Sequence, residues 1–248
     1  MSKTAFLFPG QGVQYVGMGK DFYDNDDEIK KIYKAASKAS GLDVEKLCFE
    51  DNEDINITEF TQIALLTTEL AILYAVNKKG ICADISAGLS LGEYASVFNS
   101  GVFGYEDIFE IIRQRGIYMQ NAYPVGGAMA AVIGLDIEEI EKICSSTSGE
   151  VEVANDNCPG QIVISGEEQA VAKACVRLKE AGARKTIALN VSGPFHSSLL
   201  KPAGDKLLKL LEKKKVKELK IPYISNVNAD IVYEKEMVVP LLAKQVYS

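Results

Sequence analysis

The segment best suited to chemistry is Gly88–Gly92, whose sequence GLSLG places Ser90 between two glycines. A serine becomes an exposed nucleophile where a sharp turn joins a strand to a helix, and glycines give that turn the room its backbone needs. The apolar stretch Ile81–Ser86 predicts the strand, and a helical pattern begins at Glu93. A plain glycine-rich turn has the same short signature, but the strand-turn-helix context favours a nucleophile elbow at Ser90.

A serine nucleophile needs a base, and His196 is the only histidine of the chain. A histidine can accept the serine proton near neutral pH because its ordinary pKa is about 6.5. His196 lies in Gly193–Ser197, a segment that could lie across the elbow as a loop. A lone histidine is also found as a purely structural residue, so both interpretations stay open at this point.

Arg115 occupies the apolar face of a predicted helix. Four side chains at spacings of four, three and four residues share that face: Ile108, Ile112, Arg115 and Met119. The pattern directs an arginine inward, where its guanidinium must be paired, and the planar fork suits a carboxylate. The carboxylate is either an Asp or Glu of the protein or part of a substrate.

A glycine-rich loop, Gly10–Gly19, follows the predicted strand Ala5–Phe8. It matches neither the dinucleotide pattern GxGxxG nor the phosphate-binding pattern GxxxxGK followed by Ser or Thr, which argues against nucleotide binding. A loop at the end of a strand that carries Gln11 can instead supply N–H groups to an oxyanion hole.

The predicted elements follow the order of an α/β protein. Helices are expected at 27–39, 61–78, 105–120 and 199–213, and a further strand near 221–224. Between residues 125 and 192 the order is β-α-β-β-α-β, which is that of a ferredoxin-like module. We therefore expect a hydrolase-like large α/β domain with a mainly parallel sheet, formed by residues 1–124 and 193–248. A ferredoxin-like small domain is expected as an insertion at 125–192.

Composition limits the classes of function. The 248 residues carry a formal net charge of −7, which disfavours a nucleic-acid partner. No apolar run approaches the roughly 20 residues of a membrane span, and Ala5–Phe8 is too short for a secretory leader. We expect a cytoplasmic monomer without a membrane partner. Five cysteines without a CxxC pair predict buried thiols rather than disulfides or a zinc site, and no metal is expected.

Together these motifs resemble the malonyl-CoA:acyl carrier protein transacylases of fatty acid synthesis and the related acyltransferase domains of polyketide synthases. The resemblance spans essentially the whole chain, and the ordered set is far more specific than any single motif. The motifs are Phe8–Gly12 with Gly17–Gly19, Gly88–Glu93, Arg115–Gly116 with Met119–Gln120, Asn157 with Pro159–Gln161, Gly193–Ser197, and Gln245.

The resemblance implies a ping-pong acyl transfer. Ser90 would attack the thioester of malonyl-CoA, the N–H groups of Leu91 and Gln11 would hold the oxyanion, and His196 would pass the proton to the departing CoA. The phosphopantetheine thiol of acyl carrier protein would then take the malonyl group. Malonyl-CoA is thus the implied substrate and acyl carrier protein the implied partner, and no bound cofactor is required.

Further residues acquire roles through the same resemblance. Arg115 would pair the free carboxylate of malonate, and Gln245 matches the position whose carbonyl orients the histidine in place of an acidic third member. Asn157 and Phe195 belong to the substrate-binding set. The ring of Phe195 leaves little room for an α-methyl branch and so disfavours methylmalonyl.

Three features depart from the family pattern. Leu89 stands where a histidine usually precedes the nucleophile, and Val13 stands where a serine is common. The chain stops at Ser248, where family members continue through a Pro-Val motif, so we expect a C-terminally abbreviated large domain. Two alternatives stay open: a serine hydrolase or thioesterase of the α/β-hydrolase type, and a non-catalytic, truncated acyltransferase homologue.

Overall fold

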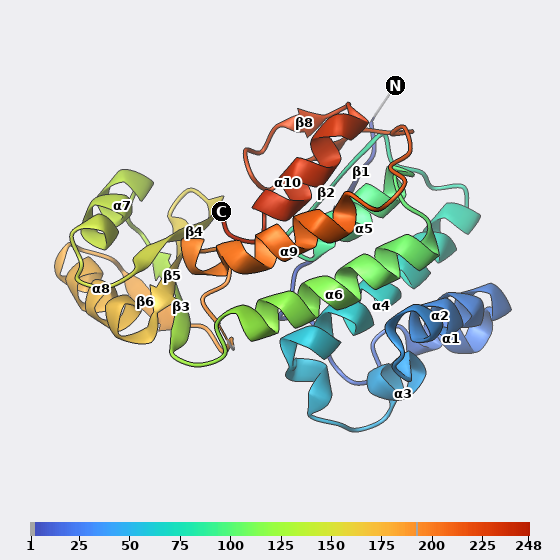
Figure 1. Cartoon of the computed structure of the whole chain (residues 1–248), viewed down its shortest axis with the longest axis horizontal. Helices are drawn as coiled ribbons and strands as arrows, with labels where there is room; N and C mark the ends of the chain where they lie inside the picture. Colours follow the sequence, from blue (N-terminus) through green and yellow to red (C-terminus); the bar gives the residue numbers. More distant parts are fainter. Residues whose placement is uncertain (1–2, 192) are drawn as a thin grey trace. The chain divides into compact units, whose positions relative to one another are not determined.

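The computed structural model describes residues 3–191 and 193–248, and the chain forms two compact units (Figure 1). The large unit comprises Met1–Ile117 and Lys206–Ala243, and the small unit comprises Tyr118–Asp205 and Lys244–Ser248. The limits of these units fall inside helices α6 (Tyr105–Ala122) and α9 (Lys201–Leu211). The small domain predicted at 125–192 has its limits outside these helices, and its end at residue 192 lies outside the described residues.

The large unit is built on a four-stranded sheet with the order β1-β2-β7-β8. Its strands are β1 (Ala5–Phe8), β2 (Ile85–Gly88), β7 (Tyr223–Ile224) and β8 (Ile231–Val232). The first three run parallel, and β8 is antiparallel to β7. This confirms the prediction of a mixed α/β fold with a parallel sheet. Because parallel strands end at the same edge, the loops that follow β1, β2 and β7 all leave the sheet on one side.

Helices surround this sheet. They are α1 (Lys20–Asn25), α2 (Asp27–Ser40), α3 (Val44–Phe49), α4 (Thr58–Lys78), α5 (Gly92–Asn99), α6, α9 and α10 (Val238–Lys244), with a 3₁₀ turn η1 at Asp54–Asn56. Figure 1 shows α6 in green beside α4 in cyan. Arg113 of α6 joins the two helices, since its guanidinium donates to the carbonyl of Glu59 at 2.9 Å.

The longest helix, α4, lies in the core of the large unit. Within the described residues it is the one helix long and apolar enough to cross a membrane by length and composition, and 67% of its apolar window is buried. A helix that is apolar on every side and mostly buried is typical of a protein core. Threonine, glutamine and glutamate side chains interrupt α4, which is why the sequence shows no long unbroken apolar run.

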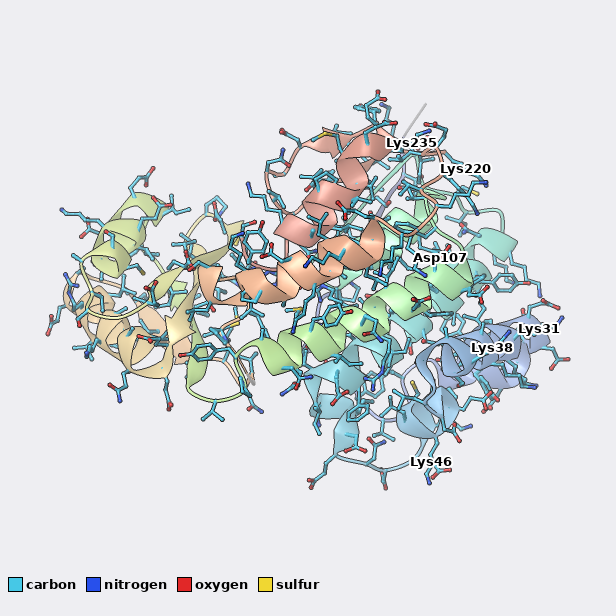
Figure 2. The ribbon with its side chains drawn as sticks, in the orientation of Figure 1. Lys31, Lys38, Lys46, Asp107, Lys220 and Lys235 are labelled. Atoms are coloured by element: carbon cyan, nitrogen blue, oxygen red, sulfur yellow. The ribbon has the colours of Figure 1, made fainter. Side chains whose placement is uncertain are left out.

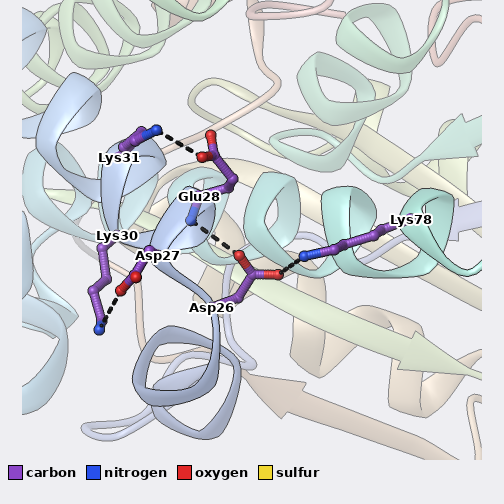
Figure 3. Close-up of polar contacts among 6 residues, drawn as sticks. All are labelled: Asp26, Asp27, Glu28, Lys30, Lys31 and Lys78. Carbon is purple, nitrogen blue, oxygen red and sulfur yellow. Dashed lines mark hydrogen bonds and ion pairs between the residues drawn. The ribbon is translucent and has the colours of Figure 1, made fainter.

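Capping ties the start of α2 to the end of α4. The Asp26 carboxylate accepts the Glu28 N–H at 3.0 Å and pairs with Lys78 Nζ at 2.6 Å (Figure 3). The bond to Lys78 holds the pKa of Asp26 below its ordinary value. Outward-facing charges such as Lys31, Lys38 and Lys46 cover α2 and α3 (Figure 2), and exposed ion pairs of this kind contribute little to stability.

The small unit contains a separate sheet with the order β4-β5-β3-β6. Along the chain the elements are β3 (Gly127–Ile133), α7 (Ile137–Ser145), β4 (Val151–Cys158), β5 (Gln161–Glu167), α8 (Glu168–Glu180) and β6 (Lys185–Ala188). Every strand pair is antiparallel. Alternate strand residues meet both helices in one apolar core that includes Val132, Ile140, Ile164, Ala174 and Leu178.

Two local predictions are wrong. The strand expected at 81–86 is observed at Ile85–Gly88, because Ile81 and Cys82 lie exposed in the connection after α4. The cysteines are not all buried, because Cys82 and Cys158 are exposed. Cys158 is the last residue of β4, next to the hairpin that leads into β5. Its side chain is exposed there and does not reach the apolar core.

Candidate active site

Ser90 lies at the turn between β2 and α5, in a backbone conformation that side chains rarely adopt. Its φ is 51°, in the left-handed region. Two glycines permit the close approach around it. A Cβ at Gly88 would lie 2.0 Å from the carbonyl carbon of Gly92, and a Cβ at Gly92 would lie 2.4 Å from the Phe8 oxygen. The turn therefore packs directly against the end of β1 and has the geometry of a nucleophile elbow.

Arg115 is fully buried on α6 and aims its guanidinium at this turn. Nη2 donates to Ser90 Oγ at 3.1 Å, and Nη1 donates to Gln62 Oε1 of α4 at 2.9 Å. The residues predicted to share its helix face, Ile108, Ile112 and Met119, are buried with it. The inward arginine expected from the spacing is thus observed, and its fork spans the nucleophile and a neutral amide.

Opposing effects act on the charge of Arg115. The guanidinium carbon lies 5.0 Å from the centre of the Tyr94 ring, a distance suited to a cation–π contact. Burial lowers the pKa of Arg115 from its ordinary value, while Tyr94 and Glu93 oppose that shift. Burial also raises the pKa of Tyr94 to about 12, so its phenol is neutral at physiological pH. The site therefore presents a positive charge next to a hydroxyl.

The Gly10–Gly19 loop follows β1 and lies at the same sheet edge as the elbow. Phe8 and Gly88 are partners in the parallel register, and the Leu89 N–H donates to the Phe8 carbonyl at 3.0 Å. Gln11 Nε2 donates to Thr58 Oγ1 at 3.2 Å, which connects the loop to the start of α4. Leu91 is the next residue after Ser90 and occupies the N-cap position of α5. Both predicted oxyanion-hole residues thus lie in the large unit, around the elbow.

His196 lies in the small unit, where a carbonyl oxygen fixes its ring. Nδ1 is 2.7 Å from the Gln245 backbone oxygen, and the imidazole is buried. A carbonyl only accepts hydrogen bonds, so this contact requires the proton on Nδ1 of the neutral ring and leaves Nε2 as the basic nitrogen. Like Ser90, His196 adopts a left-handed backbone, with a φ of 58°.

The remaining predicted residues also belong to the small unit or flank the elbow. Phe195 is buried, while Asn157 is exposed on β4 at a register shift between Asp156 and Cys158. Leu89, which precedes the nucleophile, is exposed. The structure thus groups Ser90, Leu91, Gln11 and Arg115 in the large unit, and His196, Gln245, Phe195 and Asn157 in the small unit.

Sequence reasoning missed two polar residues at the elbow. One is Gln62, which accepts from Arg115 as described above. The other is Asn226, whose Oδ1 accepts the Ser90 N–H at 2.6 Å and whose Nδ2 donates to the Gly88 carbonyl at 2.6 Å. The available signal for Gln62 was its place directly before the apolar run 63–66 of α4, and the signal for Asn226 was its position just after a parallel strand. Among the side chains described, no group of three His, Cys, Asp or Glu could hold a metal ion.

Comparisons with known proteins give a consistent result over the whole chain. Residues 5–242 match the model of the acyl transferase domain family. The chain is 44% identical over 253 aligned positions to the malonyl CoA-acyl carrier protein transacylase of Bacillus subtilis, and it covers 80% of that protein. A relative of the same name from Staphylococcus aureus (strain MW2) is 42% identical, with 82% covered.

Solved structures extend this similarity. The malonyl CoA-acyl carrier protein transacylase from Clostridium perfringens superposes with a TM-score of 0.95 at 47% identity, covering 100% of this chain and 79% of that one. A malonyl-transacylase in complex with its type II polyketide synthase acyl-carrier protein gives a TM-score of 0.95 at 37% identity, covering 100% and 82%.

Proposed function

Because the chain belongs to the acyltransferase family, we propose that it transfers the malonyl group of malonyl-CoA, through an ester on Ser90, to the phosphopantetheine thiol of acyl carrier protein. Malonyl transfer is the activity that the names of its relatives state. The observation that carries the proposal is the buried Arg115 guanidinium at 3.1 Å from Ser90 Oγ. It puts a group that binds carboxylates beside a nucleophile.

In the first half-reaction, Ser90 Oγ attacks the thioester carbonyl of malonyl-CoA. The new O–C bond forms, the Oγ proton passes to Nε2 of His196, and the carbonyl oxygen becomes an oxyanion. The N–H groups of Leu91 and Gln11 stabilise that oxyanion. The C–S bond then breaks, and His196 returns the proton to the CoA thiolate. The contact of Nδ1 with the Gln245 carbonyl supports this role, because it keeps Nε2 unprotonated in the resting enzyme.

Arg115 binds the free carboxylate of the malonyl group. The planar fork of a guanidinium binds a carboxylate through two parallel hydrogen bonds, and Arg115 is already held beside Ser90 Oγ before the substrate binds. An acetyl group lacks this charge and cannot form an ion pair with the guanidinium. The site therefore selects malonyl over acetyl.

In the second half-reaction, the thiol of phosphopantetheine loses its proton to His196 and attacks the malonyl-Ser90 ester. The new C–S bond forms, the Ser90 Oγ–C bond breaks, and His196 returns the proton to Ser90 Oγ. Acyl carrier protein is the proposed partner, and docking would use a local basic patch because both proteins are acidic. Phe195 and Asn157 complete the acyl site, with Phe195 limiting the room for an α-methyl branch. No redox or metal step is needed for this chemistry.

The proposal also includes the fold of the two units. We assign the large unit to a hydrolase-like α/β domain and the small unit to a ferredoxin-like module, supported by the strand order β4-β5-β3-β6 and the two helices that share its core. The insertion at 125–192, the monomeric state and the cytoplasmic location stay predictions. Leu89, which stands where the family usually has a histidine, is exposed and is not part of the proposed dyad.

The test is a single-turnover experiment with malonyl-CoA labelled in the malonyl group. The wild-type protein should acquire about one label per chain, on a peptide that contains Ser90, and should release it when acyl carrier protein bearing phosphopantetheine is added. Ser90→Ala should acquire none. Ser145→Ala is the matched control, since Ser145 is exposed on α7 and its hydroxyl donates only within its own helix.

The same experiment separates the alternatives. A serine hydrolase would lose the label to water at a rate that does not depend on acyl carrier protein. A non-catalytic homologue would acquire no label although it is folded. Similarity to named transacylases along the full chain favours neither alternative.

A further inference from the structure

Asn226 closes the turn that carries the nucleophile. Its carboxamide uses both ends at once, because Oδ1 accepts the Ser90 N–H while Nδ2 donates to the Gly88 carbonyl. The two backbone groups flank Leu89, so one side chain bridges the full width of the elbow. A carboxamide supplies both the acceptor and the donor on one planar group.

The sheet explains why this residue reaches the elbow. Strands β2 and β7 are parallel neighbours, with Ser86 opposite Tyr223 and Ala87 opposite Ile224. Asn226 comes two residues after Ile224, and Ser90 comes three residues after Ala87. Both therefore leave the same edge of the sheet side by side. Glu93 fixes the Asn226 backbone in turn, since its fully buried carboxylate accepts the Asn226 N–H at 3.3 Å.

The bond to Oδ1 also decides which N–H groups face a substrate. The left-handed backbone of Ser90, with φ at 51°, is unfavourable for a residue with a Cβ and persists only when its surroundings hold it. Asn226 holds it by taking up the Ser90 N–H, which is then engaged at 2.6 Å. The next N–H in the chain, that of Leu91, is the elbow donor left to serve an oxyanion.

We propose that Asn226 is a positioning residue, which holds Ser90 Oγ and the Leu91 N–H in the arrangement that acylation requires. The inference rests on the proposed function for its physiological reaction. It concerns the reactivity of Ser90 toward any acyl or phosphonyl group that reaches it. Asn226 does not contact the acyl group.

Asn226→Ala removes both bonds, and Asn226→Asp keeps the acceptor while it turns a lone pair toward the Gly88 carbonyl. Asn228→Ala is the matched control, because Asn228 is an exposed asparagine of the same loop whose side chain bonds only to Asp230. Each variant is mixed rapidly with labelled malonyl-CoA and, in parallel, with a fluorophosphonate, which reacts with activated serines. Thermal unfolding of each variant is recorded.

For Asn226→Ala we expect the rate constant of Ser90 labelling to fall about 10- to 100-fold with both reagents, as for loss of a group that preorganises a site. The labelled fraction at completion and the concentration of malonyl-CoA that gives half the maximal rate should stay unchanged. Asn226→Asp should fall in between, and Asn228→Ala should match the wild type.

A merely structural residue would give another pattern. If Asn226→Ala unfolds at a lower temperature but labels with the wild-type rate constant, the positioning role is overturned. If the wild type reacts with the fluorophosphonate and not with malonyl-CoA, the proposed function fails. The positioning role is then still judged by the fluorophosphonate rates of the Asn226 variants.

Discussion

Arg115 and Glu69 are both buried ionisable side chains of the large unit, and their surroundings differ. Arg115 bonds to Gln62 and Ser90 and lies over the ring of Tyr94. Neither carboxyl oxygen of Glu69, on α4, has a hydrogen-bond partner among the described residues. Burial alone raises the pKa of Glu69 well above its ordinary value, whereas charged and aromatic neighbours oppose the shift at Arg115.

The difference shows that burial of an ionisable group does not by itself mark a site. Glu69 lines a cavity of about 390 Å³ between β1 and α4, with apolar neighbours such as Leu65, Ile72 and Leu73. With no hydrogen-bond partner for a carboxylate among the described residues, burial favours the neutral form of Glu69 and raises its pKa. Arg115 has polar partners from two places in the fold, Gln62 on α4 and the candidate nucleophile Ser90 at the turn before α5. Convergent partners, rather than low exposure, distinguish the catalytic region.

The largest expected effect is that of removing the Arg115 charge. Arg115→Ala should lower the second-order rate constant of malonyl labelling by about 100-fold or more, because a malonate carboxylate would be bound without its partner. Labelling by acetyl-CoA should fall far less, so the preference for malonyl should collapse. Competition between the two thioesters measures this directly.

Arg113→Ala is the control for the loss of an arginine from the same helix. Arg113 forms its ion pair with Glu59, at an N–O distance of 2.9 Å, on α4 rather than at the elbow. It should keep the malonyl preference of the wild type. Equal losses for malonyl and acetyl in Arg115→Ala would contradict the assigned role and reduce Arg115 to a structural residue like Arg113.

A smaller effect is expected from the neutral partner of Arg115. Gln62→Leu removes the acceptor at 2.9 Å from Nη1 and keeps the volume on α4. We expect the KM for malonyl-CoA to rise about 5- to 10-fold, which corresponds to about 1 kcal/mol, the typical net contribution of one hydrogen bond, with a smaller change in kcat. Steady-state kinetics at fixed acyl carrier protein concentration provide the measurement. An unchanged KM would show that Arg115 needs no orientation from α4.

The smallest effect on activity is expected at Glu69. This prediction tests whether burial without polar partners raises the pKa of Glu69. Below the ordinary Glu pKa of about 4.3 the carboxyl is protonated in both the folded and unfolded states. As pH rises above that value, the unfolded state ionises first, because the folded pKa is raised. The free energy of unfolding should therefore fall with rising pH until the folded pKa is passed.

Glu69→Gln should remove this dependence, and Glu69→Leu should stabilise the protein by about 1 to 3 kcal/mol at pH 7, since it replaces an unsatisfied buried polar group. Urea unfolding between pH 4 and pH 8 compares the variants with the wild type. Malonyl labelling should be unchanged in both. A wild-type stability that did not fall relative to Glu69→Gln over this range would mean that Glu69 has an ordinary pKa.

Much of the fold could be predicted because its signals are local. The spacing of apolar residues predicted the helices α2, α4 and α6, and the glycines around Ser90 indicated the elbow. The short elements α1, α3, α10 and β8 were missed, since a few residues carry too little periodicity to stand out. The shift of β2 to Ile85–Gly88 has a similar cause, because apolar Ile81 looks like a strand residue although it lies exposed before the sheet begins.

By itself the sequence determined which groups are candidates for the chemistry, namely a serine in an elbow, a lone histidine and an arginine on an apolar helix face. These follow from residue types and spacings, which act within one element. The family resemblance indicated the Gln245 carbonyl as the partner of the histidine, whereas Gln62 and Asn226 were identified only by the tertiary structure. Gln62, Asn226 and the Gln245 carbonyl are 53, 136 and 49 residues from the groups they bond, and Glu69 lacks such a partner in the described part of the chain. Contacts across such separations depend on sheet register and helix packing, which no local pattern encodes.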